Sequence, residues 1–205
     1  MSATAFQTII DNATSISFNR RKKVAQTVSR DGTVKATSLG GQTWTFEVTP
    51  PSGLPWTTMR PIIQDMEEQD RTATSTIYIN NNNHSWINGY RGNLTNVSAV
   101  TVSFSSGNTL TITGGATLSS GYRFRQGDFI QLGSTGSVYT INSDVVFNSN
   151  TITVHRPVRE AAGTYTLRVG QAVSWSVICV NFPKWTIGSD RLVAWDGPFI
   201  FAEAI

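Results

Sequence analysis

Short runs in which polar and apolar residues alternate recur along most of this chain, and turn-forming residues separate them. Trp44, Phe46 and Val48 alternate with polar residues in one such run, and residues 164–169 repeat the pattern. A period of two places every second side chain on the same face of a strand. Short runs at this close spacing are typical of β-sandwiches and small barrels. The sequence therefore predicts a mainly β fold with a sandwich-like or barrel-like layer.

One segment departs from the strand pattern and predicts a single α-helix over about residues 57–70. Its apolar residues recur at spacings of three and four, which places them on one helix face: Met59, Ile62, Ile63 and Met66. Thr57 or Thr58 is expected to cap the N-terminus with its hydroxyl. Pro61 is expected in or near the first turn, where a missing N–H costs little.

The strand pattern also predicts two domains and one hairpin. Residues 1–93 and 170–205 are expected to form a discontinuous β domain that carries the helix. Residues 94–169 are expected to form a small β domain inserted into it. Asp31-Gly32 lies between two alternating runs, and both residues tolerate positive φ, so a tight hairpin turn is predicted there.

The chain is low in charge, and its excess of positive charge is local. Only 14% of the 205 residues are charged, against about 25% in ordinary soluble domains. Lys and Glu are depleted where protein surfaces meet, so this composition suits subunit contacts. Much of the net charge of +3 comes from the run Arg20–Lys23. A nucleic-acid binder would show a broader basic face, so at most weak contact with nucleic acid is expected.

No long apolar stretch or basic leader is present, so a soluble protein made in a cytoplasm is expected, with no membrane contact. The single cysteine, Cys179, lies in an apolar run and is predicted to be a buried, inert thiol.

Catalytic and metal-binding patterns are not apparent in the sequence. His84 and His155 are the only histidines, and neither has a second ligand at metal-binding spacing. Glu67, Glu68 and Asp128 suit solvated or turn positions better than paired acid and base roles. We therefore expect no enzyme activity, no catalytic residues, no metal and no cofactor.

Basic and aromatic residues are the candidates for a subunit interface, because aromatic side chains and Arg anchor such contacts. The candidates are Arg20, Arg21, Lys22, Lys23, Trp86, Tyr90, Trp185 and Trp195. An exposed tryptophan also suits a carbohydrate-binding platform. A carbohydrate- or receptor-binding β module therefore stays open as an alternative.

The order of several motifs resembles a group of bacteriophage structural proteins found at the distal tail or baseplate. The chain carries a Gly-Gln-x-Trp-x-Phe strand at 41–46, then Pro50-Pro51 and the helix. The inserted domain has the Gly-Asp and Val-Tyr elements of that group at 127–130 and 138–139 and an Arg-Pro pair at 156–157. The chain ends in Phe-x-Phe-x-Glu-Ala-Ile at 199–205. The group's Gly-Gln segment after the helix is replaced here by residues 70–74.

This resemblance implies a scaffold of the virion tail with no active site. Copies would form a symmetric ring and contact other tail or baseplate proteins, and weak contact with DNA in the lumen is conceivable. A capsid decoration protein is the alternative within the structural class.

Overall fold

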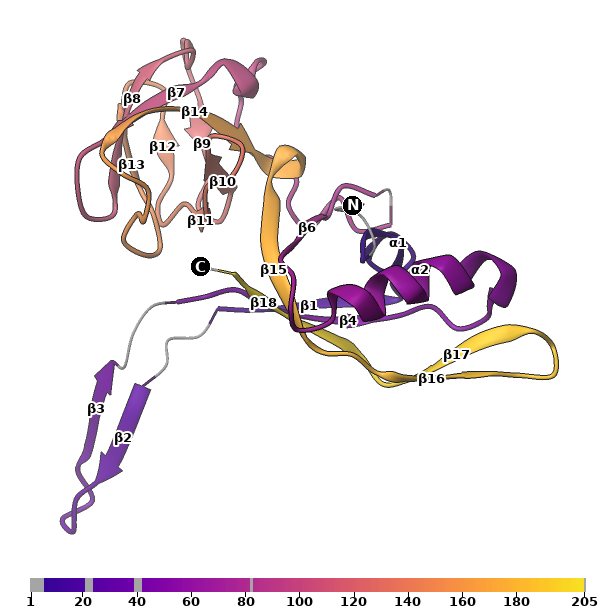
Figure 1. Ribbon diagram of the computed structural model, residues 1–205. Coiled ribbons are helices and arrows are strands. Elements are labelled where there is room, and N and C mark those ends of the chain that lie inside the picture. The colour runs from indigo at the N-terminus through magenta and orange to yellow at the C-terminus, as the bar shows by residue number, and fades with distance from the viewer. Residues whose placement is uncertain (1–5, 21–23, 39–41, 82, 205) are drawn as a thin grey trace.

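The computed structural model describes residues 6–20, 24–38, 42–81 and 83–204, and β-strands dominate them (Figure 1). The predicted mainly β class is confirmed. The prediction of a single helix is wrong, because the described residues form two α-helices. The missed helix, α1 (Gln7–Asp11), has only five residues, too few to show a helical period in sequence. It buries Ile9 and Ile10 in the core next to Phe6.

The first sheet is antiparallel and joins strands from both ends of the chain. Its order is β1-β4-β18-β15-β6. The bounds are β1 (Ser15–Asn19), β4 (Thr45–Thr49), β18 (Phe199–Glu203), β15 (Ser174–Asn181) and β6 (Ser75–Tyr78). The final strand β18 therefore lies at the centre, between β4 and β15, and ties the C-terminal end of the chain to its N-terminal half.

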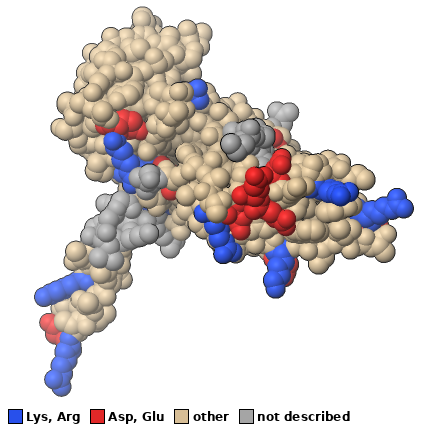
Figure 2. Space-filling model, viewed as in Figure 1, with Lys and Arg blue, Asp and Glu red and all other residues tan. Residues whose placement is uncertain are grey.

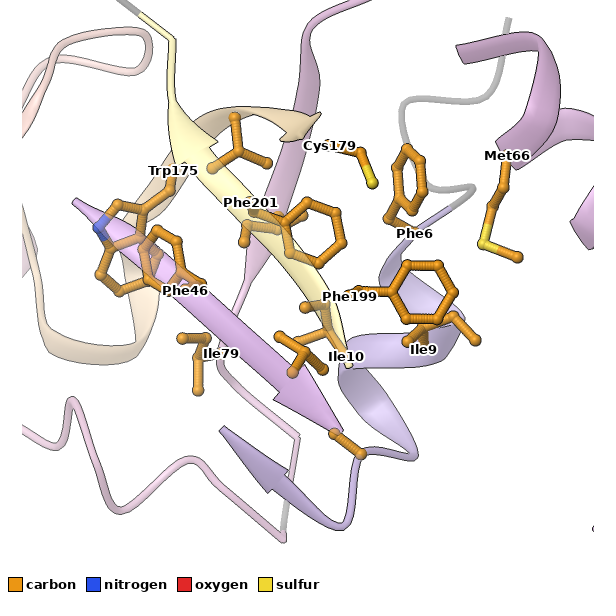
Figure 3. Close-up of a cluster of buried hydrophobic side chains, with 14 of the residues drawn as sticks. Phe6, Ile9, Ile10, Phe46, Met66, Ile79, Trp175, Cys179, Phe199 and Phe201 are labelled. Atoms are coloured by element: carbon orange, nitrogen blue, oxygen red, sulfur yellow. The ribbon is translucent and has the colours of Figure 1, made fainter. Parts of the chain in front are cut away.

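Aromatic side chains fill the core beside this sheet (Figure 3). Phe6 packs edge-on against Phe201, with ring centroids 5.2 Å apart, and Phe46 packs likewise against Trp175 at 5.4 Å. Edge-to-face contacts of this kind stabilise aromatic pairs beyond the area they bury. Cys179 lies in the same core at 1% exposure, and burial raises the pKa of its thiol to about 12. The prediction of a buried thiol is confirmed.

The long helix, α2 (Trp56–Gln69), packs Met59, Ile63 and Met66 into this core. Its beginning differs from the prediction, because Pro55 is the N-cap residue and no side chain caps the first turn. The helix therefore starts one residue earlier than expected, and Pro61 lies inside it as the sixth residue. A proline there removes one backbone hydrogen bond, so burial of the apolar face must stabilise the helix.

The second large sheet has the order β11-β10-β14-β7-β8-β13, and a two-stranded sheet β12-β9 accompanies it. The bounds are β7 (Thr101–Phe104), β8 (Thr109–Gly114), β9 (Tyr122–Phe124), β10 (Phe129–Leu132), β11 (Val138–Thr140), β12 (Val145–Val146), β13 (Thr151–Thr153) and β14 (Gly163–Val169). The fully buried residues of its core lie between Leu94 and Val169. Figure 1 shows these strands as a rounded body beside the first sheet.

Two smaller sheets extend from the first domain in opposite directions (Figure 1). One has the order β16-β17-β5, from β16 (Lys184–Ile187), β17 (Leu192–Asp196) and β5 (Leu54–Pro55). The other is the predicted hairpin of β2 (Val24–Val28) and β3 (Val34–Ser38). Two 3-10 turns, Val97–Ala99 and Gly170–Ala172, complete the described elements. No helix among the described residues is long and apolar enough to cross a membrane.

Candidate interaction surfaces

The described residues form two hydrophobic cores, one at each large sheet, and we call the two units the first domain and the inserted domain. A buried ion pair joins them. Arg156 follows β13 in the inserted domain, and Glu203 ends β18 in the first domain. The guanidinium donates from Nη1 to Oε2 at 2.6 Å and from Nη2 to Oε1 at 2.5 Å. The two side chains are only 2% and 3% exposed. This two-pronged geometry is the strongest form of an arginine–carboxylate contact.

Backbone groups around this pair complete the junction. Arg156 also donates to the carbonyl oxygens of Gln42, at 2.6 Å, and Val138, at 3.1 Å. Glu203 accepts the backbone N–H of Trp44 at 3.1 Å, and the Trp44 indole donates to the Val138 carbonyl at 2.9 Å. The contacts join four separate segments of the chain, around residues 42–44, 138, 156 and 203. They tie the two large sheets to each other.

His155 lies beside the ion pair as a neutral imidazole. Its Nδ1 accepts the backbone N–H of Thr140 at 3.0 Å, which fixes the tautomer with the proton on Nε2. Burial, and after it the nearby positive charges of Arg156 and Arg20, lower the pKa of His155 to about 3. The folded protein therefore resists protonation at this residue.

We expect the free energy of unfolding to fall as the pH drops from about 6.5 toward about 3. The unfolded chain binds a proton at His155 over this range and the folded chain does not, so the stabilisation is complete above pH 6.5 and is lost below it. His155→Asn keeps an acceptor for Thr140 without titrating. Urea unfolding of both proteins between pH 5 and 7.5 tests this, and equal slopes against pH would contradict it.

Arg20 is the only described residue of the basic run, since Arg21, Lys22 and Lys23 lie outside the described residues. Its guanidinium lies 5.5 Å from the centre of the Trp44 ring and donates to the Thr140 hydroxyl. It is half-buried at the junction. Arg20 therefore contributes to the contact between the domains, a role that its place in a basic run did not indicate.

The hairpin β2–β3 projects from the body, and we call it the arm (Figure 1). Its strands pair only with each other among the described strands, and all five side chains of β2 are exposed. The predicted turn is confirmed: Gly32 has φ +83°, and Asp31 accepts the Thr33 N–H at 3.0 Å. Hydrogen bonds from Ser29 and Thr33 lower the pKa of Asp31 to about 2, so its carboxylate stays charged.

One face of the arm is apolar although it is exposed. The register pairs Val28 with Val34 and Val24 with Ser38, which places all three valines on the same face. Val28 is 71% exposed, Val34 is 59% exposed and Val24 is 44% exposed. An isolated two-stranded hairpin is at best marginally stable in water. This arm therefore has the chemistry of a segment that is covered by another surface.

Trp86 is the most exposed large apolar side chain of the described residues, at 75%. It lies in a run of turns, 83–88, and its indole donates to the Asn83 carbonyl at 3.2 Å. The indole is thus oriented by its own loop while the ring faces solvent. Such a pre-oriented aromatic ring suits contact with a protein or with a sugar ring.

The other aromatic candidates are partly buried. The Tyr90 hydroxyl donates to the Arg123 carbonyl and accepts the Leu94 N–H at 3.0 Å, and its ring packs against the core of the inserted domain. Trp185 stacks on Trp56, with centroids 5.4 Å apart. Trp195 packs edge-on against Phe199 at 5.0 Å. Their role in an interface stays a prediction, and their described contacts are internal.

A groove lies between the end of α2 and β16, and we call it the α2–β16 groove. Its volume is about 560 Å³, and its lining combines aromatic, acidic and basic side chains: Glu67, Asp70, Arg71, Phe182, Pro183, Lys184, Trp185 and Thr186. The Trp185 indole donates to Glu67 at 3.1 Å, which fixes the ring in the groove. One oxygen of Asp70 is buried there without a hydrogen-bond partner among the described residues.

Within the described part of the chain, no group of three or more His, Cys, Asp or Glu side chains is placed to hold a metal ion. Comparison with known protein families and with curated proteins finds no match to this chain. The features of the molecule that bear on its function are therefore the arm, the groove, Trp86 and the junction.

Proposed function

We propose that this chain is a structural subunit of a bacteriophage tail, at the distal tail or baseplate. It assembles with copies of itself in a symmetric ring and with other tail proteins, and it is not an enzyme. The observation that carries the proposal is the arm, whose apolar face is exposed in the single chain. A soluble monomer gains nothing from such a face, whereas a subunit buries it on assembly.

Two further features support an assembly role. The buried Arg156–Glu203 junction ties the two domains together, which favours the fixed shape that a subunit needs for a ring to close. The motif order in the sequence resembles distal-tail and baseplate proteins, which supplies the particular assembly. DNA contact is limited in this proposal to weak contact in the lumen of the tail, and no membrane is involved.

Antibody-gold labelling of purified particles of the phage that encodes the chain tests this function. Gold at the distal end of the tail is the expected result. Gold on the capsid would replace the tail role by that of a decoration protein. No label, together with no peptides of the chain in mass spectra of the particles, would overturn the structural role.

A binding module for carbohydrate or a receptor is the second candidate, and the exposure of Trp86 favours it. Trp86→Ala is expected to leave the melting temperature unchanged, because the ring buries little surface. If Trp86 stacks on a sugar ring, the affinity of the variant for that glycan is expected to fall about tenfold or more. Its signal on a glycan array is then lost. Trp195→Ala is the control. It removes a ring packed against Phe199, so it shows how far a loss of packing alone lowers binding.

A further inference from the structure

The arm and the β16–β17 hairpin have open strand edges and lie on opposite sides of the molecule. The arm is a two-stranded sheet, and neither outer edge pairs with another described strand. The three-stranded sheet β16-β17-β5 ends in β16, whose outer edge is unpaired among the described strands as well. Figure 1 shows the arm and the β16–β17 hairpin pointing away from each other. One chain therefore cannot join its own two edges, but two chains can.

The two edges match in length and in the pattern of their side chains. β16 has four residues and each strand of the arm has five. Trp185 and Ile187 share one face of β16 by the alternation of strand residues, and Ile187 is 45% exposed. The arm presents its valines on one face in the same way. Addition of the arm to β16 would continue a single apolar face across both chains.

The surroundings of β16 suit an occupant of this composition. The α2–β16 groove runs along this strand and offers the rings of Phe182 and Trp185 to an apolar partner. α2 carries a net charge of minus two, from Arg60 against Asp65, Glu67 and Glu68. The arm carries a net charge of plus one over 24–38, from Arg30 and Lys35 against Asp31. Figure 2 shows Lys and Arg on the arm and a group of Asp and Glu over α2.

We infer that the arm of one copy adds to the free edge of β16 in a second copy, with its valine face along the α2–β16 groove. This inference rests on the proposed function, in which copies of the chain assemble in a ring, and it names the surfaces through which they meet. Strand addition supplies backbone hydrogen bonds, and the apolar face and the groove supply specificity. The contact joins different surfaces of the two copies, so repetition closes a ring or extends a filament. Lys184, at the start of β16, limits unspecific pairing at this edge.

Cross-linking between two variants that each carry one added cysteine tests the contact. Thr37→Cys and Thr186→Cys place thiols on the arm and on β16, each on the exposed strand face opposite the apolar one, so the apolar contact itself is unchanged. Cys179 does not interfere, because it is buried and its thiol pKa is raised to about 12. A short bismaleimide added to the mixed variants is expected to give a covalent dimer that neither variant gives alone. A chain that carries both cysteines is expected to give a ladder of multimers.

The matched control replaces Thr186→Cys by Thr111→Cys, on an exposed position of β8 in the inserted domain. Cross-linking of Thr37→Cys to this control as strongly as to Thr186→Cys would overturn the inference. A protein that stays monomeric and uncross-linked at every concentration would overturn it as well. Each variant is expected to keep its fold, because all three positions are exposed, and near-ultraviolet circular dichroism checks this.

A second pair of variants measures the same contact without cysteines. Ile187→Lys is expected to weaken self-association about tenfold or more, because it places a charge in the paired face. Val146→Lys, at a similarly exposed valine of the inserted domain (40%), is expected to leave it unchanged. If neither changes self-association while gold still labels the tail, the arm binds another tail protein and only the inference fails. If the cross-link forms but particles lack the chain, the proposed function fails and the contact stands.

Discussion

Glu203→Gln is expected to lower the free energy of unfolding by about 3–5 kcal/mol, the cost of leaving one charge of a buried pair without its partner. The Arg156 guanidinium is 2% exposed, so water cannot replace the lost carboxylate. The change also weakens the acceptor of the Trp44 N–H. A loss of this size lowers the melting temperature by about 6–20 °C in a chain of this length. Urea unfolding followed by tryptophan fluorescence measures it.

The control for this loss is an ion pair on the surface. Arg125 contacts Asp144 at 3.0 Å with side chains 42% and 38% exposed, and its guanidinium also stacks on Tyr122. Arg125→Gln is expected to cost no more than about 2 kcal/mol, since exposed pairs and cation–π contacts each contribute about 1 kcal/mol or less. If Glu203→Gln costs as little as Arg125→Gln, the buried pair does not stabilise the junction.

The double variant Arg156→Met with Glu203→Leu separates the pair from its surroundings. Removing both charges leaves no unpaired ion, so the double variant is expected to be more stable than the sum of the two single losses predicts. The expected coupling is about 1–3 kcal/mol. The remaining loss would report the Gln42 carbonyl and the Trp44 N–H, which lose these partners, since the Val138 carbonyl keeps the Trp44 indole as a donor.

The sequence predicted local features well because their causes are local. The Asp31-Gly32 turn, the apolar face of α2 and the buried Cys179 each follow from a few neighbouring residues. The Arg156–Glu203 pair was not predicted, although Arg156 lies in the Arg-Pro pair and Glu203 in the C-terminal Phe-x-Phe-x-Glu-Ala-Ile motif. The partners are 47 positions apart in the chain and meet only through the arrangement of the sheets. Sequence without an alignment carries no signal for such a pair.

For the candidate interface residues too, the sequence predicts the local chemistry, and only the fold shows where each side chain lies. A basic run predicts charge but not burial, so Arg20 could not be assigned to the junction. A tryptophan in the sequence predicts a large apolar side chain but not whether it is exposed. In the structure Trp86 is exposed to solvent, whereas Trp185 packs against α2. The exposed face of the arm required the register of β2 and β3. That register places Val24, Val28 and Val34, which do not stand out in the sequence, on one surface.

Val28→Thr combined with Val34→Thr is expected to prevent assembly while leaving the folded monomer unchanged. Threonine keeps the branched shape and strand preference of valine, so the hairpin persists. Both side chains are exposed in the single chain, so the melting temperature is expected to stay the same. In a covered face each valine contributes about 1.5–3 kcal/mol on full burial, so their replacement weakens each contact by about a hundredfold or more. Mass photometry of the purified protein and recovery of the variant in phage particles measure the two effects.

The control variant changes the other face of the same arm. The register places Ala25 and Thr37 opposite each other on that face, so Ala25→Thr with Thr37→Ser alters the hairpin to a similar extent without touching the valines. Normal assembly of this control together with loss of assembly in the valine variant assigns the contact to the apolar face. Normal incorporation of the valine variant into particles would show that the apolar face is not buried on assembly. The ring would then depend on other surfaces, and Trp86, which is exposed on a loop of its own, would be the first to test.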